Sequence, residues 1–170
     1  TFAATDQFTN ETVRTLNQQL ASTGLVPAAR LSQVVAKIRL QEGPGAGGED
    51  GSVNGNVITL TAKGEIPAAF NPPKTLLHEL GHIVWREMSE KERTQSLDRL
   101  EATLAARGEK VATGAITWAM ILDGVRIDRR RDPEHAFTPI WDFMLTDPTL
   151  ASETLAPTWF SQRQPAGVGR

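Results

Sequence analysis

Two histidines four residues apart lie in a strongly apolar, helix-forming stretch, and they restrict the fold more than any other feature. The stretch covers residues 75–85 and reads TLLHELGHIVW. Its leucine, isoleucine, valine and tryptophan side chains cover the helix on almost every side, so we expect the helix to be buried. Two imidazoles and a carboxylate in such a helix cost free energy unless a partner compensates them. A bound cation is a natural partner.

The spacing of these residues is that of a zinc site. Residues four apart lie on one helix face, so His78 and His82 can share one zinc ion. Glu79 can reach a water at the metal without binding the metal itself, accept its proton and later donate it to a leaving amine. Gly81 has no side chain, which allows another element to approach this helix closely. The sequence therefore predicts Zn²⁺ as cofactor, His78 and His82 as ligands, and Glu79 as the catalytic residue.

A catalytic zinc ion normally has three protein ligands and one water, so a third ligand is needed. We predict Asp123, because its carboxylate lies in residues 121–124, inside the apolar helix expected over 113–130, and requires a partner there. Gly124 beside it would let that helix pack tightly against its neighbour.

Three alternatives for the third ligand remain open. Glu101 follows His82 at a spacing that one large peptidase class uses, and Asp128 lies beside a run of arginines. His135 is the only other histidine in the chain. It could bind the metal or stabilise an oxyanion, and Arg126 is a second candidate for the latter role.

Hydrophobic periodicity and end signals predict an α+β fold. A first helix begins at Thr9 or Asn10 and stops at Gly24, and Ser89 with Glu92 forms a capping box. The turn signal Asn54-Gly55 precedes a strand. The expected strands cover residues 34–41 and 57–61, and the later helices cover residues 71–88, 89–108, 113–130 and 137–145.

Length and composition limit the classes of function. The 170 residues suit one domain over 1–170, with a loose tail at 157–170. The chain begins with threonine, so we expect a processed product or a domain cut from a longer protein. A net charge of -2 argues against nucleic-acid binding driven by bulk charge, and the lack of cysteine excludes thiolate ligands. No stretch approaches the roughly 20 apolar residues of a membrane helix. The expected partner is a protein or peptide substrate.

Residues 56–60 and 71–82, including HELGH, resemble zincin-type metallopeptidases. They are similar in particular to the compact domains of lethal-factor-like bacterial toxins and of phage or plasmid polyvalent proteins. The resemblance implies a small sheet beside a buried metal-bearing helix, with residues 57–61 pairing with an extended substrate. It also implies a glutamate ligand on a downstream helix, where this chain has Ala119. Asp123 lies one turn further along, and the triplet of residues 122–124 resembles the segment that supplies an aspartate ligand in site-2-type proteases.

These observations predict a zinc-dependent endopeptidase in which a metal-activated water attacks the peptide bond. The departure at Ala119 motivates an alternative, a non-catalytic zincin-like module that binds a partner within a toxin or a phage or plasmid polyvalent protein. A purely structural zinc site is a third reading.

Overall fold

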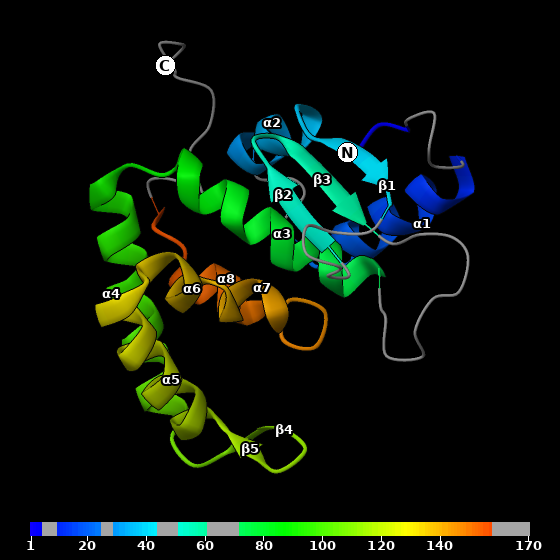
Figure 1. Cartoon of the computed structure of the whole chain (residues 1–170). Helices are drawn as coiled ribbons and strands as arrows, with labels where there is room; N and C mark the ends of the chain where they lie inside the picture. Colours follow the sequence, from blue (N-terminus) through cyan, green and yellow to red (C-terminus); the bar gives the residue numbers. More distant parts are fainter. Residues whose placement is uncertain (5–9, 25–28, 44–50, 61–71, 158–170) are drawn as a thin grey trace, which may run out of the picture.

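The computed structural model describes residues 1–4, 10–24, 29–43, 51–60 and 72–157 (Figure 1). Its elements follow one another as α1 (Asn10–Ala21), α2 (Ala29–Ala36), β1 (Arg39–Glu42), β2 (Gly51–Asn54), β3 (Val57–Leu60), α3 (Pro72–Glu87), α4 (Glu90–Arg107), β4 (Val111–Thr113), β5 (Ile116–Thr117), α5 (Trp118–Arg131), α6 (Pro133–Phe137), α7 (Pro139–Asp142) and α8 (Thr149–Thr154). The mixed α+β class predicted from the sequence is confirmed. The predicted loose tail lies outside the described residues except for Pro157.

The first sheet has the strand order β1-β3-β2, with β1 parallel and β2 antiparallel to β3. The predicted turn is confirmed: Gly55 has φ +60°, a conformation that glycine adopts without strain. Strand β3 contains the described part of the predicted substrate strand 57–61. It is central rather than an edge, so the prediction that it offers a free edge is wrong. Within the described sheet, β1 and β2 are the edges.

The segment before β1 corrects a second prediction. We expected a strand over residues 34–41, but residues 29–36 form helix α2 and only Arg39–Glu42 is extended. Leu31, Val34, Val35 and Ile38 are all buried. Their spacing is that of one helix face, and it overlaps the alternating pattern that suggested a strand.

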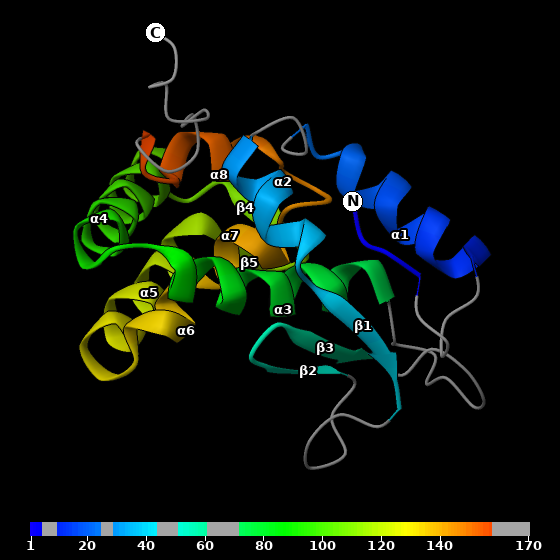
Figure 2. The ribbon, with the colours of Figure 1, turned by 90° about the horizontal axis from the view of Figure 1, so that it is seen from above.

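Helix α3 is the central element of the fold, and it ends within a residue of its predicted end. It contacts β2 and β3 on one side and α1, α2, α6 and α7 on others. Figure 2 shows it running between β2 and β3 on one side and α1 and α2 on the other. Its buried apolar residues are Leu76, Leu77, Leu80, Ile83, Val84 and Trp85, and Met88 just after the helix is also buried. The expected burial on several sides is therefore confirmed.

Helices α4 and α5 pack side by side and form, with the β4–β5 hairpin, an arm that leads away from the sheet (Figure 1). The predicted capping box is present, since Ser89 N donates to Glu92 and Glu92 N donates to Ser89 Oγ. The predicted helix start at residue 113 is wrong. Residues 111–117 form the hairpin, with Gly114 at φ +55° in its turn, and Thr117 caps α5 by accepting a hydrogen bond from Met120 N.

The C-terminal helices are short. We expected one helix over residues 137–145, but prolines at 133 and 139 begin two separate helices, α6 and α7. Helix α8 was not predicted. In the part of the chain that the structure describes, no helix combines the length and apolarity needed to cross a membrane.

Candidate metal centre

Helix α3 brings His78, Glu79 and His82 together as the spacing predicted. The two imidazole centroids are 5.2 Å apart. Glu79 is 8% exposed and His82 is 9% exposed, whereas the His78 side chain is more open at 35%. A carboxylate and an imidazole are thus held at a buried helix surface, beside a second imidazole that solvent can reach.

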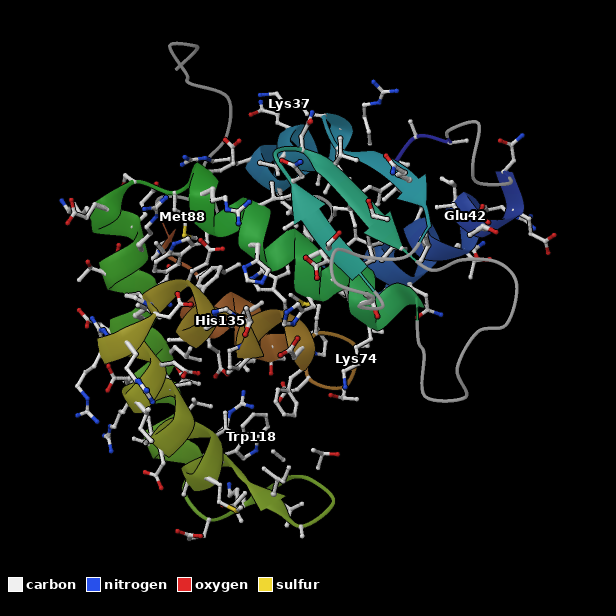
Figure 3. The ribbon with its side chains drawn as sticks, in the orientation of Figure 1. Lys37, Glu42, Lys74, Met88, Trp118 and His135 are labelled. Carbon is white, nitrogen blue, oxygen red and sulfur yellow. The ribbon has the colours of Figure 1, made fainter. Side chains whose placement is uncertain are left out.

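The third histidine of the chain approaches from α6. The His135 ring centroid lies 5.6 Å from that of His82. Figure 3 labels His135 where α6 meets α3. Its Nδ1 is 2.5 Å from Asp132 Oδ2, and both side chains are more than half exposed. The hydrogen bond with His135 lowers the pKa of the Asp132 carboxyl below its usual value.

The two histidines of α3 also have carboxylate partners from the C-terminal segment. His78 Nδ1 lies 2.6 Å from Asp142 Oδ1, and His82 Nδ1 lies 2.7 Å from Glu134 Oε2. The same Glu134 oxygen accepts a hydrogen bond from Arg86 at 3.2 Å. Each of the three imidazoles is therefore oriented through Nδ1 by a carboxylate. An acidic partner of a ring nitrogen is the usual companion of a metal-binding histidine.

A close contact between Gly81 and Trp141 holds the C-terminal segment against α3. A Cβ built on Gly81 would lie 2.5 Å from Trp141 Cδ1, so the indole occupies the space that a side chain would need. Trp141 is fully buried, and Phe137 packs between it and Trp85. The prediction that Gly81 allows close approach is confirmed, and the residue after Trp141 is the Asp142 that meets His78.

Asp123, the predicted third ligand, lies on the outer face of α5. Its neighbours Leu122 and Val125 are buried, whereas Asp123 itself is exposed. Among the described contacts, none joins Asp123 to His78 or His82. The structure therefore does not bring the predicted ligand set together, and its role stays a prediction.

The remaining alternatives occupy different surroundings. Glu101 accepts hydrogen bonds from Arg126 and Arg129, and these ion pairs join α4 to α5. Arg126, the second candidate for stabilising an oxyanion, is thus paired with Glu101 on the arm. Asp128 is half-buried, and its backbone carbonyl accepts a hydrogen bond from Asp132 N. Of the alternatives, His135 is the one in ring contact with a motif histidine.

The three imidazoles do not close around a common point as they stand. Within residues 1–4, 10–24, 29–43, 51–60 and 72–157, no group of three or more His, Cys, Asp or Glu side chains is placed to hold a metal ion. The donors themselves suit zinc, because neutral imidazole nitrogens are among its preferred ligands. The His135 side chain is 59% exposed, so packing does not enclose it.

Comparison with known proteins adds no relative from which a role could be transferred: no protein-family model, no curated protein and no solved structure matches the chain.

The sequence reasoning missed the acidic partners Glu134 and Asp142. One signal could have indicated them. Phe137 and Trp141 are four residues apart, so they mark one buried helical face, and Glu134 and Asp142 flank these anchors. An acidic residue next to such a buried aromatic residue is expected to lie near the element against which the aromatic ring packs. Nothing in the sequence pattern shows that this element is α3.

Proposed function

We propose that the protein is a zinc-dependent endopeptidase with His78, His82 and His135 as ligands and Glu79 as general base. One observation carries the proposal: His78 and His82 share a face of α3 beside the buried Glu79, and each is held through Nδ1 by a carboxylate. With Nδ1 paired in this way, Nε2 would be the nitrogen that binds the metal. We favour His135 over Asp123 because its ring contacts His82, whereas Asp123 faces solvent on α5.

The chain's own residues would divide the chemistry between them. When bound, zinc polarises a scissile carbonyl and makes water more acidic. Glu79 would accept a proton from the attacking water at its carboxylate and pass it to the leaving amine. Its burial keeps this carboxylate at a partly dehydrated helix surface beside the two histidines.

An extended substrate would pair with β2 rather than with β3. Strand β2 is an edge of the described sheet, and edge strands offer unpaired backbone groups to a peptide. Its first residue, Gly51, lies against Thr75 of α3, one helical turn before His78. This contact connects the β2 edge to the helix that bears the histidines, so it supports an endopeptidase acting on extended chains.

The first experiment compares the wild type with Glu79→Gln in zinc content and in hydrolysis of an unfolded protein such as casein. We expect the variant to retain zinc and to lose about 10²–10⁴-fold in activity, the usual contribution of a general base. Glu153→Gln is a matched control, because Glu153 pairs with Arg107 and is not a candidate ligand. A wild type that binds no zinc, or a Glu79→Gln variant that cleaves normally, would refute the proposal.

A second candidate function is a non-catalytic binding module, and a specific surface favours it. In the described part of the chain, the large hydrophobic residues that are well exposed all belong to the arm: Val111 at 63%, Ile116 at 43%, Met120 at 55% and Ile127 at 45%. Exposed apolar patches often mark protein contacts. If this reading holds, purified protein will show neither zinc affinity nor hydrolysis.

A further inference from the structure

The carboxylates that contact Nδ1 of the three histidines come from one short segment, which supplies one carboxylate to each ring. Asp132 precedes α6, Glu134 lies in α6 and Asp142 ends α7. Their oxygens lie 2.5, 2.7 and 2.6 Å from the Nδ1 atoms of His135, His82 and His78, respectively. The chain distance between His78 and Asp142 is 64 residues, so this pairing arises from the fold and not from local sequence.

These contacts determine which ring nitrogen carries the proton. An ionised carboxylate has no hydrogen to donate, so each short contact requires that Nδ1 carry the proton and donate it. In a neutral imidazole the other nitrogen, Nε2, then keeps its lone pair. As neutral rings, all three histidines would then have the same tautomer, with the proton on Nδ1.

We infer that Glu134, Asp142 and Asp132 are positioning residues that fix the Nε2-binding tautomer of the three histidines and so set the metal affinity of the site. The inference rests on the proposed function for the identity of the metal. The segment 132–142 would then supply both the third ligand and the orienting acid of every ligand.

Of the three carboxylates, Glu134 is expected to have the largest effect on zinc affinity. It serves the most buried of the three imidazoles: the His82 side chain is 11% exposed, against 35% for His78 and 59% for His135. Arg86, one turn beyond His82 on α3, donates to the same carboxylate oxygen and balances its charge. Asp132, by contrast, pairs with His135 in an open setting. The expected order of importance is Glu134, then Asp142, then Asp132.

The first measurement is zinc affinity, taken by competition with a chromophoric chelator on the full chain. Glu134→Gln and Asp142→Asn keep the side-chain size and remove the charge, and we expect Glu134→Gln to lower zinc affinity about 10–100-fold. Asp132→Asn should have the smallest effect. The control Glu153→Gln removes a carboxylate that pairs with Arg107 and should change nothing. Thermal unfolding without metal checks that each variant is folded.

The second measurement reads the tautomer directly, by ¹⁵N NMR of the imidazole nitrogens in metal-free protein. In the wild type we expect the proton of the His82 ring to lie on Nδ1. In Glu134→Ala we expect it to exchange between Nδ1 and Nε2. Folded variants that bind zinc as tightly as the wild type, with unchanged tautomers, would overturn the inference while leaving the proposed peptidase intact. A wild type that binds no zinc would overturn the proposed function, and the NMR measurement would still decide whether the carboxylates set the tautomer.

Discussion

The junction of α3 with α6 and α7 and the arm of α4, α5 and the hairpin are both built from packed helices, but a glycine is enclosed in the first and open in the second. At the junction, the Trp141 indole occupies the space that a Gly81 side chain would need, beside the buried His82 and its partner Glu134. On the arm, Arg129 and Glu101 form a part-buried ion pair between helices, and a Cβ on Gly124 would meet no atom within 4 Å. The difference indicates that packing against Trp141 constrains the junction, whereas α5 has free space at Gly124.

The largest expected effect is on zinc affinity, and it should distinguish substitutions at the junction from a substitution on the arm. His78→Ala or His135→Ala at the junction should weaken zinc binding by more than about 100-fold, because loss of a ligand should exceed the 10–100-fold loss of an orienting partner. Asp123→Ala on the arm should leave the affinity unchanged. Competition with a chelator measures all three. If Asp123→Ala weakens binding and His135→Ala does not, the arm supplies the third ligand and the junction assignment fails.

The second prediction concerns packing at the junction. Gly81→Ala should destabilise the protein by about 1–3 kcal/mol, because the new methyl group meets the Trp141 ring and must displace it. Urea unfolding of metal-free protein measures this change. Zinc affinity should fall as well, since Trp141 adjoins Asp142.

A double-mutant cycle provides the control for this packing prediction. Trp141→Phe combined with Gly81→Ala should cost less than the sum of the two single changes, because the smaller ring leaves room for the methyl group. Purely additive costs would show that the glycine is not required by the indole.

Features that are specified by residues close together in the chain could be predicted from the sequence, whereas features that depend on distant residues could not. The α3 helix, its HELGH face and the Ser89 capping box were predictable because residues within one or two turns specify them. The alternating residues at 34–40 fitted a strand and a helix equally, and the burial of Leu31 and Val35 decides for the helix. The central place of β3 depends on strand pairing between distant residues, which periodicity does not encode.

The same limit applies to the candidate site. His78, Glu79 and His82 were predictable because they share one helix turn. The partners Asp142 and Glu134 were not, since they lie 64 and 52 residues from their histidines. Asp123 was chosen because its segment is apolar, but an apolar segment can form a helix with one buried face and one exposed face. The pattern did not show that Asp123 lies on the exposed face of α5.

The third prediction is a stabilising change on the arm. Gly124 lies inside α5, it is not in the left-handed conformation, and a Cβ there would meet no atom within 4 Å. Gly124→Ala should therefore raise the free energy of unfolding by about 0.4–1 kcal/mol, chiefly by reducing the freedom of the unfolded chain. The opposite signs expected for Gly81→Ala and Gly124→Ala test the comparison directly. A destabilising Gly124→Ala would mean that another surface packs against this part of α5.

The smallest effect is expected on the exposed face of the arm. Met120→Gln and Ile127→Gln replace side chains that are about half exposed, so each should change the stability of the monomer by no more than about 0.5 kcal/mol. Unfolding should be followed at several protein concentrations, because contact between copies makes stability depend on concentration. If the wild type becomes more stable as its concentration rises and Ile127→Gln abolishes that dependence, the arm is a contact surface, and its exposed hydrophobic residues are buried in an assembly. If neither protein shows such a dependence, the face is free in the isolated chain, and its apolar residues contribute little to the fold that holds the histidines in place.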